Sequence, residues 1–230
     1  MGEHVLGGNP PVAVTLRQSA RARRISLRVS RLDGQITLTV PKGVSTQEAL
    51  SFADEKSDWI RKHLAARPAD RRVAIGGSIL FEGQEVDILA GRVRAAKLID
   101  GQLVVPASES MVTPRVVAFL KARARARLTE ASTRYAAQVG RPFGRISIRD
   151  TRSRWGSCSS EGNLMYSWRL VMAPPEALEY VAAHEVCHLV HMDHSDRFWG
   201  AVQAIYPDYK IQRNWLRKNG EQLHQWVFKD

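Results

Sequence analysis

The stretch HEVCHLVHMDH, residues 184–194, contains four of the seven histidines of the chain. Residues four positions apart on a helix lie on the same face, so His184 and His188 can direct two imidazoles at one metal ion. Glu185 projects beside them and can reach a water molecule on that metal. Two helical ligands, a general base and an open coordination position are the requirements of a zinc peptidase site.

A third ligand is expected among the residues that follow His188. His191 lies near the same helical face, whereas His194 lies beyond the expected helix end at about Met192. Three ligands from one straight helix would crowd one side of the ion, so a bend that returns His194 from below is favoured. Asp193 can adopt the left-handed conformation that such a bend requires.

Two alternatives for the third ligand stay open at this point. His191 is one of them, or else it is a neighbour that supports the ligands. The other is Glu221, the only glutamate after Glu185, which lies beyond the last expected helix.

Length and composition indicate an ordinary globular protein. The 230 residues suffice for one large domain or two small ones. No apolar run approaches the roughly 20 residues of a membrane span, and the N-terminus lacks the basic start and apolar core of a secretory signal. The two cysteines, Cys158 and Cys187, are too few for a disulfide framework. We therefore expect a cytoplasmic protein without membrane contact, and its oligomeric state stays open.

The net charge of +11 raises a second hypothesis about partners. Basic residues cluster at 17–31, 67–72 and 121–134, and such surfaces attract polyanions without regard to sequence. The plainer interpretation is that these are solvated faces, because no zinc finger or aromatic-interleaved RNA signature accompanies them. A nucleic-acid-binding protein with a structural metal site is nevertheless kept as the alternative function.

The first part of the chain reads as strand-rich. Residues 1–11, rich in Gly and Pro, are expected to form a loose tail. Strands are expected at 12–16, 25–29 and 35–40, with a hairpin turn at Asp33-Gly34. Ser45 or Thr46 should cap a helix that runs to about Ala66 and ends before Arg67-Pro68. Further strands are expected at 78–82, 84–90, 97–99 and 102–105.

The second part reads as mainly helical. Thr113-Pro114 should open a long helix, and extended segments at 145–150 and 164–170 should precede the histidine-bearing helix, which begins at Pro174-Pro175. We expect 164–170 to be either an edge strand that pairs with a peptide substrate or an ordinary core hairpin. Ser195 should cap another helix, and a last one should span about 209–218. The fold class is α+β, with domains at 12–110 and 111–230.

Several segments together resemble the YgjP-like metallopeptidases, a group related to the SprT-like zincins. They are RWGSCS (154–159), WRL (168–170), AP (173–174), YV (180–181), HEVCH (184–188), HS (194–195), FW (198–199) and PDY (207–209). The resemblance extends from about Leu16 to Leu223. It implies a minimal zincin-like domain at 111–230, Zn²⁺ held by His184, His188 and His194, and Glu185 as the catalytic residue. It supplies no substrate beyond a peptide or protein.

The expected activity is metal-dependent hydrolysis of peptide bonds. Glu185 would take a proton from the attacking water and pass it to the leaving amine. The free ring nitrogens of the ligands should donate to carboxylates or backbone carbonyls, with Asp193, Asp196 and Asp208 as candidates. Tyr209 and His191 are candidates for stabilising the oxyanion. By analogy with SprT-like proteins, a protease acting on DNA-bound proteins would combine both hypotheses.

Overall fold

The computed structural model describes residues 2–30, 34–66 and 69–228, and it has the mixed α+β content that the sequence predicts. The chain divides into two compact units, Met1–Ala69 and Asp70–Asp230, whose hydrophobic cores share no residue. This division differs from the boundary expected at 110/111. The reason lies in the second unit, where the strands that precede residue 110 pack against the helices that follow it.

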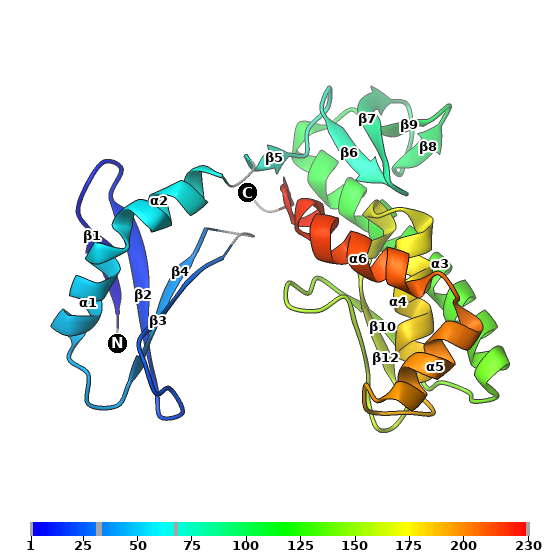
Figure 1. Cartoon of the computed structure of the whole chain (residues 1–230). Coiled ribbons are helices and arrows are strands. Elements are labelled where there is room, and N and C mark those ends of the chain that lie inside the picture. Colours follow the sequence, from blue (N-terminus) through cyan, green and yellow to red (C-terminus); the bar gives the residue numbers. More distant parts are fainter. Residues whose placement is uncertain (1, 31–33, 67–68, 229–230) are drawn as a thin grey trace. The chain divides into compact units, whose positions relative to one another are not determined.

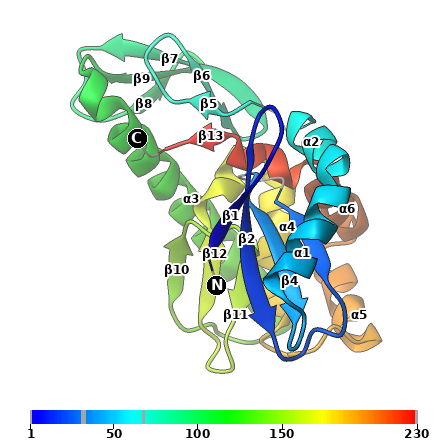
Figure 2. The same cartoon turned by 90° about the vertical axis from the view of Figure 1, so that its left-hand side faces the viewer.

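The first unit is a four-stranded sheet with two helices on one face (Figure 1, Figure 2). Its strand order is β1-β2-β4-β3, with β2 parallel to β4 and the other pairs antiparallel. The side chains of Val14, Leu38 and Ile60 are fully buried between the sheet and the helices. The elements are β1 (Glu3–Leu6), β2 (Val12–Ser19), β3 (Ser26–Val29), β4 (Ile36–Pro41), α1 (Thr46–Glu55) and α2 (Ser57–Ala65).

Two expectations about this unit differ from the structure. Residues 3–6 are strand β1 rather than part of a loose tail, because they pair with β2 and bury Leu6 in the core. The helix expected up to Ala66 is interrupted at Lys56, which leaves helical geometry with φ −98° and ψ 8°. The expected cap at Ser45 is confirmed, since its hydroxyl accepts the N–H of Glu48 at 3.1 Å. The predictions for Asp33, Arg67 and Pro68 fall on positions outside the described residues.

The second unit begins with a four-stranded sheet of order β6-β7-β9-β8. Its strands are β6 (Ser78–Phe81), β7 (Gln84–Gly91), β8 (Lys97–Ile99) and β9 (Gln102–Pro106). Asp100 and Gly101, with φ of 48° and 77°, make the tight turn between β8 and β9 that the sequence predicts. Ile88 and Leu103 of this sheet belong to the same core as Leu120 of helix α3 (Glu109–Val139), so the sheet and the helix form one unit.

Helix α3 begins earlier than expected. Its N-cap is Ser108, and Pro114 lies in its second turn rather than at its first position. The missing N–H of Pro114 removes one helical hydrogen bond, a loss that the packing of the rest of the helix offsets. Leu120, Ala124, Leu128 and Ala131 recur on the buried face of α3, against which the histidine-bearing helix packs.

The rest of the second unit surrounds helix α4 (Pro175–Cys187). Helices α3, α5 and α6 and strand β11 all pack against α4. A three-stranded sheet of order β10-β12-β11 lies beside it, so β12 is a central strand and β11 is at an edge. The edge strands are therefore Ile146–Arg149 and Gly156–Cys158, whereas in the segment 164–170 residues 164–167 form the central strand and residues 168–170 begin a 3-10 helix. The elements are β10 (Ile146–Arg149), β11 (Gly156–Cys158), β12 (Leu164–Ser167), η1 (Trp168–Met172), α5 (Asp196–Ile205), α6 (Tyr209–Asn219) and η2 (Gly220–His224).

Buried Arg169 ties the end of the chain to this unit. Its guanidinium donates to the Asp150 carboxylate, with Nε–Oδ1 at 2.8 Å, and to the carbonyl of Leu223 at 2.9 Å. These charge-assisted bonds compensate the burial of the arginine. Beyond Leu223, β13 (Trp226–Val227) pairs in parallel with β5 (Arg71–Arg72) and so joins the two ends of the unit. Within the described residues, no helix combines the length and apolar character needed to cross a membrane.

The two separate cores predict separate effects of core mutations. Leu38→Ala in the first unit and Leu128→Ala in the second should each lower the free energy of unfolding of their own unit by about 2–5 kcal/mol, because both side chains are fully buried. Hydrogen exchange measured by mass spectrometry should show faster exchange only in the mutated unit. Faster exchange throughout both units in either mutant would contradict the division at 69/70.

Candidate metal centre

Helix α4 supplies the first histidine and ends at the second. Pro175 occupies its first turn, as the sequence predicts, and His184 lies in its last turn. The helix ends at Cys187, with His188 as its C-cap, several residues before the end expected at about Met192. The N–H groups of Leu189 and Val190 then bond to carbonyls three residues back, at 2.9 and 3.1 Å, so the last turn tightens and the chain leaves the helix axis.

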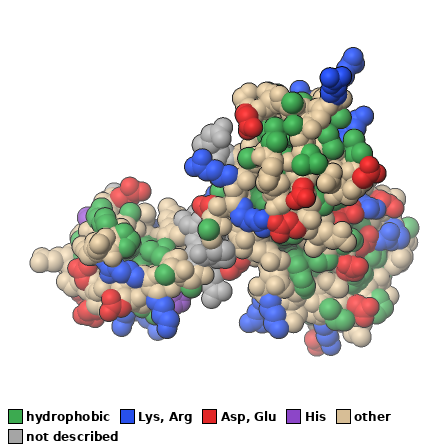
Figure 3. Space-filling view, turned by 90° about the horizontal axis from the view of Figure 1, so that it is seen from above, with side chains coloured by type: hydrophobic (Ala, Val, Ile, Leu, Met, Phe, Trp, Pro, Cys, Tyr) green, Lys and Arg blue, Asp and Glu red, His purple; other side chains and the backbone are tan. Residues whose placement is uncertain are grey.

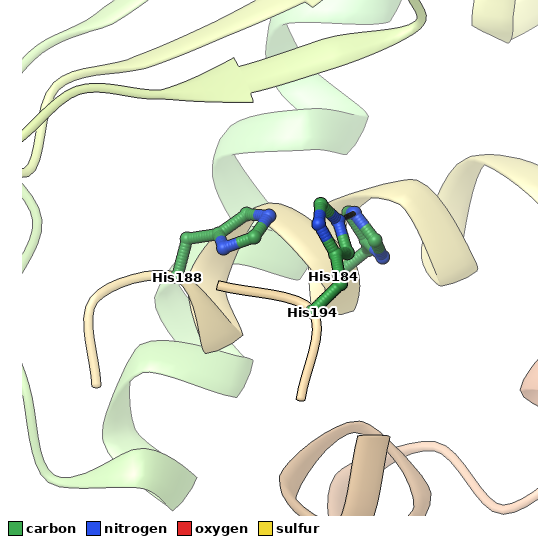
Figure 4. Close-up of side chains that lie close together, drawn as sticks. All are labelled: His184, His188 and His194. Atoms are coloured by element: carbon green, nitrogen blue, oxygen red, sulfur yellow. Dashed lines mark hydrogen bonds between the residues drawn. The ribbon is translucent and has the colours of Figure 1, made fainter. Parts of the chain in front are cut away.

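Three imidazoles converge where the chain returns (Figure 4). Candidate ligand atoms of His184, His188 and His194 all lie within 4.8 Å of one another. The ring Nε2 atoms of His184 and His194 are 3.2 Å apart. The His188 ring lies nearly perpendicular to both other rings, at 88° to His184 and 86° to His194. The structure thus brings together the three histidines that the sequence analysis favoured, and neither His191 nor Glu221 is in this cluster.

His191 contributes its backbone rather than its side chain. Its carbonyl oxygen lies 2.9 Å from Nδ1 of His188. This bond places the proton on Nδ1 and leaves the lone pair of Nε2 available for a cation, which is the arrangement found around histidine ligands of metals. None of the carboxylates considered from the sequence, Asp193, Asp196 and Asp208, is needed to orient His188.

Asp193 makes the bend by a different route than expected. The non-glycine residues with positive φ in the described ranges are Glu82 and Asp100, so Asp193 does not adopt the left-handed conformation. Its carboxylate instead accepts the backbone N–H of Ser195 at 3.1 Å and the Ser195 hydroxyl at 2.7 Å. A side chain that bonds to the backbone two residues later forms a local turn, and this turn leads from His194 into α5.

Aromatic side chains enclose the three histidines on one side. Phe198 of α5 stacks on His188, with ring centroids 4.4 Å apart, and Trp199 lies 5.6 Å from His184. Tyr209 stacks on Trp199 at 5.3 Å and is itself buried, which makes it part of this wall rather than a free donor. A wall of this kind excludes water and strengthens electrostatic interactions within the site.

Burial keeps His184 and His188 neutral. Burial first, and then the charges of His188, His194 and Arg213, lower the pKa of His184 to about 3. The pKa of His188 is also lowered by burial, although its bond to the His191 carbonyl opposes the shift. A neutral imidazole is the form that coordinates a metal, so both rings are ready to act as ligands at neutral pH.

Glu185 lies in the same apolar surroundings, with 6% of its surface exposed. Burial raises its pKa to about 8, and the positive charge of Arg154 opposes part of that shift. A divalent cation at the adjacent histidines would favour the ionised carboxylate and lower this pKa. The carboxyl group is therefore poised to change protonation in response to charge in the site.

Gly156 of β11 allows that strand to lie directly against Glu185. A Cβ atom at position 156 would be 2.5 Å from Cγ and 2.6 Å from Oε1 of Glu185. Only a residue without a side chain fits at this distance. The sequence contained the glycine within RWGSCS, but no local pattern reveals that it faces a glutamate 29 positions later.

A pocket of about 350 Å³ opens beside His184 and Glu185. It is bounded by the segment 154–156, by Tyr180 and Val181 of α4, and by Arg213, Leu216 and Arg217 of α6. Tyr180 lies one helical turn before His184, and burial raises its pKa to about 12, so its hydroxyl remains a hydrogen-bond donor. The sequence analysis assigned no role in the site to Tyr180, Arg154 or Arg213, although the first two lie in segments that carry the family resemblance. For Tyr180, its spacing of four residues before His184 was a usable signal.

The donor set fits a transition-metal ion such as zinc. Three imidazole ligands would leave one coordination position of a four-coordinate ion for water or substrate, as is typical of catalytic zinc sites. The buried Nδ1 of His184 has no hydrogen-bond partner among the described residues, and the two Nε2 atoms of His184 and His194 face each other closely. A cation held between these rings would bind the two Nε2 lone pairs that otherwise face each other.

Comparison with known families identifies the domain that contains this centre. The family model described as YgjP-like, metallopeptidase domain, matches residues 23–219 of the 230 residues. The match covers the first unit from Arg23 onward and the second unit up to Asn219, so β1, β2, η2 and β13 lie outside it. No curated protein matches the chain.

The contact between Gly156 and Glu185 predicts a coupled pair of mutations. Gly156→Ala should lower the free energy of unfolding by about 1–3 kcal/mol, because the added methyl group overlaps Glu185. The loss should be smaller in a Glu185→Ala background, where the overlapping atoms are gone. Chemical denaturation of the parent, the two single variants and the double variant measures this coupling. Gly200→Ala in α5 is the control, because its Cβ meets no atom within 4 Å. Equal losses in both backgrounds would contradict the contact.

The raised pKa of Glu185 predicts how metal-free protein responds to pH. The folded chain keeps this carboxyl protonated up to about pH 8, whereas the unfolded chain loses the proton near its ordinary value of 4.5. The folded state therefore binds the extra proton, and the free energy of unfolding falls by up to about 1.4 kcal/mol per pH unit as pH rises. His184, with its pKa lowered to about 3 from 6.5, affects stability only below about pH 6.5.

Glu185→Gln isolates this effect between pH 6.5 and 8. The variant should lose the downward slope in this range and become more stable than the parent at pH 8. Urea denaturation of chelator-treated protein at a series of pH values measures this slope. The unfolding transition to follow is the one whose midpoint shifts when zinc is added, because it reports on the unit that contains Glu185. Parallel pH profiles for the two proteins would show that Glu185 is already ionised in the folded state.

Proposed function

Since the chain belongs to the YgjP-like family of metallopeptidases, we propose that it is a zinc-dependent peptidase in which His184, His188 and His194 hold the metal and Glu185 is the general base. The observation that carries this proposal is the convergence of the three imidazoles within 4.8 Å beside a buried carboxyl group. The three rings come from one helix end and from the turn that follows it, as the HExxH spacing with a third histidine implies.

Zinc is the proposed ion because of the donor chemistry. Imidazole suits zinc better than it suits magnesium or calcium, which prefer oxygen ligands. The chemistry that zinc supplies in such a site is Lewis acidity, which acidifies water and polarises a carbonyl group. Within the described residues, no carboxylate belongs to the ligand cluster, which further favours a nitrogen-preferring ion.

Glu185 is the group that moves the proton. It follows His184 directly on α4, and its carboxyl borders the same pocket. In its ionised form it takes a proton from the attacking water and delivers it to the leaving amine of the cleaved peptide bond. Burial raises the pKa of Glu185, so the carboxyl group can hold the proton after taking it from water. It can then give the same proton to the leaving amine.

The peptide itself is proposed to lie along β11. This strand is at the edge of its sheet and borders the pocket through Gly156. An extended peptide can add to such an edge by backbone hydrogen bonds, which recognises the main chain rather than particular side chains. Tyr180, with its neutral hydroxyl on the wall of the pocket, is the proposed donor to the developing oxyanion, in place of Tyr209.

The nucleic-acid alternative remains a prediction with less support. On the face shown in Figure 3, Lys and Arg side chains lie among Asp and Glu side chains rather than in one continuous basic patch. On helix α3, Arg127 pairs with Glu82 at 3.0 Å and Arg134 pairs with Glu179, so part of its positive charge is neutralised. A cytoplasmic location is likewise proposed, and it is supported by the two free cysteines, Cys158 and Cys187.

The proposal predicts a separation between metal binding and hydrolysis. Purified protein should carry about one zinc per chain, and Glu185→Gln should keep that zinc while losing at least about a hundredfold in peptide hydrolysis, because the general base is removed. Metal content by atomic spectroscopy and cleavage of a mixed peptide library measure both. Full peptidase activity in Glu185→Gln would refute the assigned role of the carboxylate.

Two histidine variants serve as a matched pair for the metal site. His194→Ala should lose zinc, whereas His191→Ala should retain it, because only the backbone carbonyl of His191 takes part. Zinc loss in His191→Ala with retention in His194→Ala would reverse the ligand assignment.

A further inference from the structure

The pocket beside the metal centre carries an unusual concentration of positive charge. Three of its lining residues are arginines: Arg154 before β11, and Arg213 and Arg217 on α6. All three side chains are exposed to solvent. Glu185 is the single carboxylate among the described residues that line this pocket. We refer to Arg154, Arg213 and Arg217 as the arginine cluster.

The cluster lies close to the groups proposed to react. All three arginines line the same pocket as His184 and Glu185, so their guanidinium groups are near the proposed place of peptide-bond cleavage. Charged groups of a bound substrate at this place would meet the field of these guanidinium groups.

Arg213 is held in place rather than extended freely into water. Its guanidinium carbon lies 4.5 Å from the ring centroid of Trp199, which itself stacks on Tyr209. A cation over an aromatic face is stabilised and loses little of its capacity to donate hydrogen bonds in the ring plane. The side chain is thus preorganised to bind an anion.

Ordinary structural roles explain only part of the cluster. Arg217 lies in the last turn of α6, where a positive charge is favoured by the helix dipole. Arg213 lies in the middle of α6, and Arg154 lies in the loop before β11, where no such preference applies. Apart from Glu185, the remaining lining residues carry no carboxylate that would repel an anion; they are Trp155, Gly156, Tyr180, Val181, His184 and Leu216.

We propose that the arginine cluster selects peptide substrates that carry a carboxylate close to the cleaved bond. Guanidinium groups bind carboxylates through paired, charge-assisted hydrogen bonds. Two sources of this carboxylate fit the chemistry: the side chain of Asp or Glu, and the α-carboxylate at the end of the peptide. The inference rests on the proposed peptidase function, and it adds the substrate class to it.

The test uses the zinc-loaded full chain with Glu185→Gln, so that binding is measured without cleavage. Four peptides of equal length combine Glu or Gln near the centre with a free or amidated C-terminus. Isothermal titration calorimetry should show the Glu peptides, the free-acid peptides, or both binding at least about tenfold more tightly than the neutral peptide. The comparison between the two sources identifies which carboxylate the cluster binds. Equal affinity for all four peptides would overturn the proposal.

Variants that remove positive charges then show which residues cause the preference for carboxylate-bearing peptides. Arg154→Gln with Arg217→Gln should reduce the preference to less than about threefold, while leaving Arg213 and its contact with Trp199 intact. Arg94→Gln with Lys218→Gln removes the same charge from exposed positions of the same unit that do not line the pocket, and the preference should persist. An equal loss in both double variants would assign the preference to the overall charge of the protein and overturn the proposal.

Two further outcomes separate this inference from the proposed function. If the parent chain cleaves neutral and acidic peptides at equal kcat/KM, the inference fails while the peptidase function stands. If the parent cleaves nothing but the carboxylate preference in binding persists, the peptidase function fails while the pocket assignment stands. A short single-stranded oligonucleotide that displaces the acidic peptides by binding more tightly would assign the arginine cluster to phosphate and refute the proposal.

Discussion

The metal centre depends on the early end of helix α4. If the helix continued through His191, its histidines would all project from one rod, and His194 could not return toward His184. The backbone bonds of Leu189 and Val190 to carbonyls three residues earlier end the helix at Cys187. The same tightening brings the His191 carbonyl within 2.9 Å of the His188 ring, so a single local change both redirects the chain and fixes a tautomer.

Several features of the fold and of the histidine cluster could be predicted because they depend on residues that are close together in the sequence. The spacing of His184 and His188 fixes their common face wherever the segment is helical, and the turn at Asp100-Gly101 follows from residues that tolerate positive φ. Ser45 as a cap and Pro175 at the start of α4 are equally local. In each case the physical preference is set within a few neighbouring residues, so the sequence suffices.

The features that could not be predicted depend on distant partners. Whether residues 3–6 form a strand is decided by the open edge of β2, and the boundary at 69/70 is decided by a core that joins β7 and β9 to α3. The prediction of a left-handed Asp193 was wrong because the turn is instead made by a hydrogen bond from the Ser195 backbone N–H to the Asp193 carboxylate. The contact of Gly156 with Glu185 joins two segments 29 positions apart, and no periodicity encodes such a meeting.

Strand β11 links Glu185, the proposed base, to the side of the pocket where the peptide is proposed to bind. Because Gly156 has no side chain, the strand lies against Glu185 closely enough to limit the positions of its carboxyl group. The strand is extended by the neighbouring Trp155, whose carbonyl accepts the N–H of Ser167 at 2.8 Å. Trp155 in turn packs against Gly220, where an added Cβ would lie 2.9 Å from the indole ring. The edge that would receive a peptide is therefore held by contacts on both sides, to α4 and to the end of α6. A displacement of β11 would move the wall of the pocket and the surroundings of Glu185 together, so this short strand would couple the proposed substrate recognition to the proposed chemistry.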